Sequence, residues 1–161
     1  MRTHSVQRWL VLQGSLLFAV GLFTGIWSGL ALNGTMNVAS PHLALAAHLN
    51  ALMGGLWLLG VAFTLPFMGY DEVQKRRLAW LCLVPAWGNW AITLVASGIG
   101  VNGLAYNGNR LNNIVAFLLQ TVVVLPSLVG GIYWLRGLWK GPKDEQHTGS
   151  VVPDHRLASH G

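Results

Sequence analysis

Residues 43–68 read LALAAHLNALMGGLWLLGVAFTLPFM, an apolar stretch that contains no Lys, Arg, Asp or Glu. About 20 apolar residues are enough for a helix to cross a bilayer, so this stretch predicts a membrane-spanning helix. Comparable stretches occupy residues 9–32, 78–100 and 111–138. Four consecutive crossings joined by short links predict an all-α integral membrane protein, an antiparallel bundle of four transmembrane helices.

The overall composition agrees with a chain that lies mostly in lipid. Hydrophobic residues make up 53% of the sequence and charged residues only 9%, whereas soluble domains carry about 25% charged residues. We expect one transmembrane domain, residues 1–139, followed by a polar, disordered cytoplasmic tail at 140–161. The first stretch follows Arg2 and Arg8 but exceeds the roughly 7–15 apolar residues of a signal peptide, so we expect it to be a helix.

Basic residues indicate the orientation. They precede the first stretch, lie between the second and third, and lie at or after the end of the fourth: Arg2, Arg8, Lys75, Arg76, Arg77, Arg136, Lys140 and Lys143. The other two links hold only Arg110. The positive-inside rule therefore predicts a multi-pass protein of the inner (cytoplasmic) membrane with both termini cytoplasmic. This asymmetry explains the net charge of +5. No basic patch alternates with aromatic residues, so nucleic acid is not an expected partner, while membrane lipid is.

His48 is the most informative polar residue. An ionisable side chain within a membrane span is costly and is a functional hypothesis by default, and imidazole is a common metal ligand and proton carrier. The alternative is a hydrogen bond to Asn112 or to a free carbonyl, worth about 0.6 kcal/mol. The absence of a CxxCH sequence excludes covalent c-type haem. With no second intramembrane histidine in the chain, a haem on His48 would be five-coordinate.

Several amides accompany this histidine. Asn50 is two positions further on, about 200° around the helix, so the two side chains are expected on opposite faces. Asn89 needs a partner near the bilayer centre. The third link, residues 98–113, is rich in amides. We expect one pocket in the outer half of the membrane, lined by His48, Asn89, Tyr106, Arg110, Asn112 and Asn113.

Glycines indicate close helix packing. Gly21, Gly25 and Gly29 are four residues apart, which favours close approach of a neighbouring helix. The pair Gly54–Gly55 lies about two turns beyond His48 and leaves room for a flat ligand or for another helix. Cys82 is expected to be an inert buried thiol. Residues 69–77, with two acidic residues followed by KRR, are interpreted as a solvated turn.

Three sequence segments resemble a known family. These are AHLNALMGG at 47–55, VAFTLP at 61–66 and WGN at 87–89, within a similarity that covers about residues 43–131. They resemble the hydroxylaminobenzene mutases, which are related to the styrene oxide isomerases, small four-helix membrane enzymes. The resemblance implies an isomerase that rearranges an aromatic compound within one molecule.

The resemblance also implies a cofactor. Styrene oxide isomerases are haem b enzymes assembled as trimers, in which a histidine of the second helix ligates the iron. Carried over, the metal ligand is His48, with Gly54 and Gly55 as neighbouring cofactor contacts. The family's helix-two asparagine falls on Gly54 and its helix-three tyrosine on Thr93. These departures favour the mutase branch, with Asn50 as the substitute for the missing amide.

The resulting hypothesis is conversion of hydroxylaminobenzene to 2-aminophenol, in the breakdown of nitroaromatic compounds, by a haem-containing homotrimer. Iron on His48 would polarise the N–O bond, and the candidate catalytic residues are Asn50, Asn89, Tyr106 and Asn113. The alternatives are an epoxide-to-aldehyde isomerase, a small haem-carrying membrane subunit, and a transporter or scaffold. The absence of acidic or basic residues within the spans argues against ion-coupled transport.

Overall fold

The computed structural model describes residues 3–142, and within them all regular structure is helical. The elements are α1 (Thr3–Leu32), α2 (Pro41–Thr64), a short 3₁₀ turn η1 (Leu65–Phe67), α3 (Glu72–Ile99), α4 (Arg110–Leu118), a π-helical segment η2 (Leu119–Val124) and α5 (Leu125–Trp139). α4, η2 and α5 form one continuous span, and all four spans are long and apolar enough to cross a membrane. The predicted four-helix membrane bundle is confirmed.

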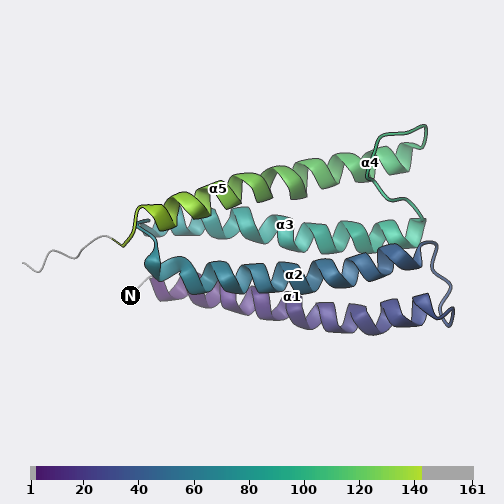
Figure 1. The fold of residues 1–161 in the computed structure, drawn as a ribbon, viewed down its shortest axis with the longest axis horizontal. Helices are drawn as coiled ribbons and strands as arrows, with labels where there is room; N and C mark the ends of the chain where they lie inside the picture. Colours follow the sequence, from purple (N-terminus) through teal and green to yellow (C-terminus); the bar gives the residue numbers. More distant parts are fainter. Residues whose placement is uncertain (1–2, 143–161) are drawn as a thin grey trace, which may run out of the picture.

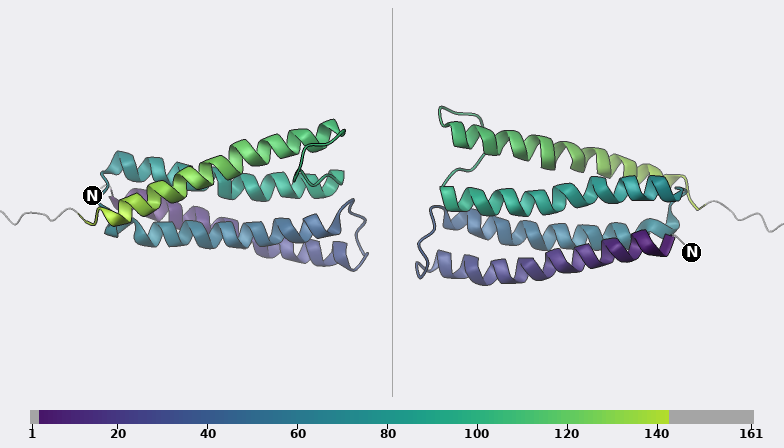
Figure 2. Two further views of the ribbon diagram at one scale, coloured as in Figure 1. Left: turned by 45° about the horizontal axis from the view of Figure 1, so that its top comes forward. Right: turned by 180° about the vertical axis from the view of Figure 1, so that it is seen from behind.

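Consecutive spans are neighbours and run antiparallel (Figures 1 and 2). α2 packs between α1 and α3, and the fourth span packs on α3. Figure 1 shows the start of α1, the α2–α3 connection and the end of α5 at the same end of the bundle. Most of the predicted tail, residues 143–161, lies outside the described residues, as does Arg2.

The start of α3 corrects the interpretation of residues 69–77 as a turn. Asp71 caps the helix: its carboxylate accepts the backbone N–H of Gln74 at 2.8 Å, and the Gln74 side chain accepts the N–H of Asp71 at 3.1 Å. This capping box starts the helix about two turns before the apolar stretch begins. Lys75 is consequently a helical residue, largely buried, with its Nζ 3.9 Å from a Glu72 carboxylate oxygen.

The fourth span contains a wide π-helical turn directly before Pro126. Proline lacks an N–H, and its ring would clash with the carbonyl of Val122 in a regular α-helix. In this turn the N–H of Leu125 bonds to the carbonyl of Gln120, one residue further back than in an α-helix. The π turn therefore accommodates the proline without breaking the span. α3 likewise continues through Pro85.

Glycines let α1 and α2 approach closely, as the sequence predicted. A Cβ on Gly55 would lie 2.9 Å from the carbonyl oxygen of Gly14, and one on Gly21 would lie 3.1 Å from the Cβ of Ala51. Gly29 differs, because a Cβ there would meet nothing within 4 Å. Cys82 is fully buried, in agreement with the prediction.

The lateral surface of the bundle is apolar. Large hydrophobic side chains are exposed on every span, among them Phe23, Phe63, Val95 and Ile132. In water such a surface would favour aggregation, whereas lipid tails solvate it at no cost. The bundle is therefore built to be covered by lipid, by other copies of the chain, or by both.

Candidate functional site

His48 faces α1 and is held there by a backbone carbonyl. Its Nδ1 lies 2.8 Å from the carbonyl oxygen of Gly21. A carbonyl only accepts hydrogen bonds, so Nδ1 carries the proton and donates. In the neutral ring Nε2 then keeps its lone pair, and within residues 5–142 it has no hydrogen-bond partner. Metal-ligating histidines are commonly oriented in this way, with one nitrogen donating to a carbonyl and the other left to the metal.

Gly25 makes room for the imidazole. A Cβ at this position would lie 2.7 Å from Cε1 and 2.8 Å from Nδ1 of His48, closer than side-chain carbons approach one another. Sequence reasoning assigned Gly25 to helix packing, which is confirmed, and missed that part of this packing is against the ring of His48. The spacing of two glycines on α1 was the available indication, but only the helix register shows which of them faces the histidine.

The donor set at His48 fits one axial position of a haem iron. It offers a single imidazole with a free Nε2 on a half-buried side chain. Residues 5–142 hold no cluster of three or more His, Cys, Asp or Glu side chains, so a metal site built from several protein ligands is absent from them. Of the two glycines expected beside a cofactor, Gly55 is buried against the backbone of α1, which occupies the room that the sequence offered to a flat ligand.

Asn50 faces the opposite side of α2, towards α3, as its position in the helix predicted. Its Nδ2 donates to Oδ1 of Asn89 at 3.2 Å and to Oγ1 of Thr93 at 3.0 Å. Both bonds link α2 to α3. Within the described residues, Oδ1 of Asn50 and Nδ2 of Asn89 keep no partner. One free acceptor and one free donor thus remain in the cluster.

These two amides line a hollow of about 280 Å³ between α2, α3 and the fourth span. Its walls are mostly apolar and carry no charge: Asn50, Met53, Gly54, Trp57, Pro85, Ala86, Asn89, Val123 and Ser127. A cavity of about 150 Å³ is enough to hold a benzene ring. The hollow therefore has room for one aromatic ring with a small polar substituent.

The amides of Asn112 and Asn113 hydrogen-bond to the backbone of the loop between α3 and α4. Asn112 accepts the N–H of Gly103 at 2.9 Å and donates to the carbonyl of Ala105 at 2.6 Å. Asn113 makes the same pair of bonds, both 2.8 Å, with the backbone of Asn107. Short polar side chains commonly satisfy nearby loop backbone in this way.

Tyr106 lies in the same loop, between α3 and α4. Its hydroxyl donates to Oε1 of Gln120 at 3.2 Å on the exposed surface, and Asn113 lines a separate surface hollow with Arg110. The expectation of a single outer pocket is not met in the chain. The structure brings Asn50 and Asn89 together with Gly54, places His48 on the other face of α2, and leaves Tyr106 and Asn113 at the loop.

Comparison with known proteins identifies the family. A family model described as styrene oxide isomerase matches residues 6–139. The chain belongs to the styrene oxide isomerase family. It is also similar to hydroxylaminobenzene mutase HabB of Ectopseudomonas oleovorans, with 26% identity over 90 residues. That match covers 56% of this chain and 51% of the relative, so it spans about half of the relative's length. No solved structure matches the chain.

The family match confirms the resemblance drawn from the sequence. The resemblance implied departures from the family at Gly54 and Thr93. Gly54 lines the hollow, and Thr93 accepts a hydrogen bond from Asn50. Asn50 occupies the space beside them, because it lies one turn before Gly54 and bonds directly to Thr93.

Proposed function

We propose that this chain is a membrane isomerase that converts hydroxylaminobenzene to 2-aminophenol. Membership of the styrene oxide isomerase family supports an isomerase, and the similarity to a hydroxylaminobenzene mutase supports the substrate. The observation that carries the proposal is the uncharged hollow with a free amide oxygen on Asn50 and a free amide nitrogen on Asn89. A hydroxylamino group needs both, because its N–H and O–H donate and its oxygen accepts.

In the proposed reaction the N–O bond breaks and a C–O bond forms at the ortho carbon. The proton on that carbon is released, and the nitrogen takes up one proton to become the amine. Substrate and product have the same composition, so no oxidant or reductant is consumed. The Nδ2 group of Asn89 donates to the migrating oxygen, and Oδ1 of Asn50 accepts the substrate N–H. An amide stabilises developing charge without becoming charged itself. Apolar walls that include Met53 and Trp57 exclude water, which would otherwise attack the ring.

Haem b is proposed as the cofactor, and Nε2 of His48 would hold its iron. When bound, the iron would supply a Lewis acid. His48 and the hollow lie on opposite faces of α2, and an assembly of several copies, proposed here as a homotrimer, would bring such faces together. The basic residues at one end of the bundle support an inner-membrane protein with both termini cytoplasmic.

The proposal is tested with detergent-purified protein. Its visible absorption spectrum reports bound haem, and product analysis with hydroxylaminobenzene in ¹⁸O-labelled water reports the reaction. We expect a haem spectrum and 2-aminophenol that carries the substrate's own oxygen. Incorporation of solvent oxygen, or absence of 2-aminophenol from a haem-loaded preparation, would contradict the proposed reaction.

A second candidate is rearrangement of an epoxide to an aldehyde, which the family match supports directly. The same preparation is assayed with styrene oxide for this purpose. Faster turnover of styrene oxide than of hydroxylaminobenzene would favour this activity. Haem with a reversible redox potential and no turnover of either compound would instead indicate a haem-carrying membrane subunit.

A further inference from the structure

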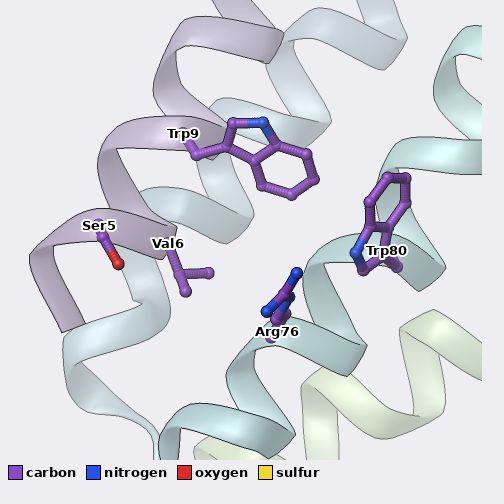
Figure 3. A pocket seen from close by; sticks show the side chains of 5 residues that line it. All are labelled: Ser5, Val6, Trp9, Arg76 and Trp80. Carbon is purple, nitrogen blue, oxygen red and sulfur yellow. The ribbon is translucent and has the colours of Figure 1, made fainter. Parts of the chain in front are cut away.

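A hollow of about 280 Å³ lies between α1 and α3 at the basic end of the bundle, away from the polar hollow. Ser5, Val6 and Trp9 line it from α1, and Arg76 and Trp80 line it from α3. Figure 3 shows the Arg76 side chain rising from α3 into the space beside Val6, with the two indoles further along their helices. The Trp9 and Trp80 rings lie 5.2 Å apart between centroids and border the hollow on the membrane side.

A second hollow, of about 500 Å³, lies on the surface of α3. It is lined by Val73, Arg76, Arg77, Trp80 and Leu81. Apart from the two guanidinium groups its walls are apolar. The two hollows share Arg76 and Trp80, so a single elongated molecule can follow both.

The positive charge at this place is not compensated within the described residues. Arg76 and Arg77 are exposed, and neither makes an ion pair or a hydrogen bond there. The neighbouring carboxylates are otherwise engaged: Asp71 caps α3, and Glu72 lies beside Lys75. Guanidinium groups bind phosphate oxygens through paired hydrogen bonds.

We propose that these two hollows bind one anionic phospholipid. Its phosphate lies at Arg76 and Arg77, and an acyl chain follows the apolar wall of Trp80 and Leu81. Tryptophans occupy the headgroup level of bilayers, and basic pockets between helices at the cytoplasmic face select anionic headgroups. An acidic peptide would satisfy the guanidinium groups but not the apolar groove beside them.

The test uses the full chain in nanodiscs of one part phosphatidylglycerol to four parts phosphatidylcholine, with bound lipid counted by native mass spectrometry. We expect phosphatidylglycerol to be enriched on the protein over its share of the bilayer. Each basic residue contributes about fivefold to the attraction of an anionic membrane surface. The double variant Arg76→Gln, Arg77→Gln is therefore expected to lose roughly twentyfold to thirtyfold in preference.

Two matched controls distinguish binding at this site from a general effect of removing an exposed arginine or tryptophan. Arg110→Gln removes an exposed arginine at the end of the bundle opposite to the two hollows. Trp139→Ala removes an exposed tryptophan of α5 at the same end as the two hollows. Both are expected to keep the preference, whereas Trp80→Ala loses it. Equal losses in the controls, or an unchanged preference in the double arginine variant, would overturn the proposal. So would displacement of the lipid by inorganic phosphate at the same concentration, because the hollows would then bind a free anion.

Discussion

The Nδ1 atom of His48 on α2 lies 2.8 Å from the carbonyl oxygen of Gly21 on α1. This contact places a proton on Nδ1, because the carbonyl can only accept a hydrogen bond. The ring also needs the missing side chain of Gly25, where a Cβ would lie 2.7 Å from Cε1. The position of the His48 ring is therefore set by the α1–α2 interface rather than by α2 alone.

Gly25→Ala tests this dependence. The new methyl group forces the His48 ring out of its position, at a cost of about 1–3 kcal/mol for overpacking. We expect loss of most bound haem and of isomerase activity while the helix content measured by circular dichroism stays unchanged. Gly29→Ala is the matched control, since a Cβ there meets nothing within 4 Å. If Gly25→Ala keeps full haem loading, the ring of His48 does not need this position.

Substitution of Asn50, which bonds to Asn89 and Thr93, is expected to lower the turnover rate much more than the stability. Asn50→Ala removes the bonds to Asn89 and Thr93, each worth about 0.6 kcal/mol within a membrane. We expect kcat to fall by about tenfold or more, since one such donor or acceptor contributes at least that to a transition state. The measurement is steady-state turnover of hydroxylaminobenzene together with thermal unfolding in detergent.

Asn113→Ala is the control for this experiment. It also removes two hydrogen bonds, but these hold the backbone of Asn107 in the loop between α3 and α4. We expect a similar loss of stability with kcat nearly unchanged. A loss of kcat in Asn113→Ala as large as in Asn50→Ala would return the loop to the reaction site and contradict the assignment to the hollow.

Hydropathy and length predicted the fold because a membrane span must satisfy its own backbone hydrogen bonds, which leaves few alternatives to a helix. The start of α3 was predicted too late, because the capping box of Asp71 and Gln74 lies before the apolar stretch. The opposite directions of His48 and Asn50 followed from helical geometry. Their partners on other helices did not, because the rotation of each helix about its axis depends on packing that no local pattern encodes. The amides at residues 98–113 misled for a different reason, because they bond to the nearby loop backbone instead of lining a shared pocket.

Tyr70 predicts a dependence on alkaline pH. Its hydroxyl donates to the carbonyl of Tyr133 at 2.6 Å. Burial, together with the neighbouring Tyr133, raises the pKa of Tyr70 above its ordinary value, and Arg136 only partly opposes this. The folded state therefore keeps the proton at a pH where the unfolded chain releases it. This contribution to stability is present below about pH 10 and is lost as the pH rises through the raised pKa.

Thermal unfolding of wild type and Tyr70→Phe at about pH 8 and about pH 10.5 measures this contribution. We expect Tyr70→Phe to be less stable than wild type by about 1 kcal/mol at the lower pH, through loss of the hydrogen bond. The difference should shrink at the higher pH, because only the wild type carries the ionising group. A difference that grows with pH would show that the hydroxyl ionises more easily in the folded state.

The two tryptophans around the WGN sequence predict opposite responses to the same substitution. Nε1 of Trp87 is buried without a hydrogen-bond partner in the described part of the chain, whereas Nε1 of Trp90 donates to Oγ1 of Thr24 at 3.1 Å. Their rings meet edge to face at 5.7 Å between centroids, a contact that phenylalanine retains.

Replacement by phenylalanine removes the same volume at each site. At Trp87 it also removes an unsatisfied donor, whose burial costs about 1–3 kcal/mol. At Trp90 it removes the hydrogen bond to Thr24. We therefore expect Trp87→Phe to be more stable than Trp90→Phe by about 1 kcal/mol or more, measured by unfolding in one detergent. The reverse order would mean that the N–H of Trp87 is satisfied in the membrane, by bound water, lipid or another copy of the chain.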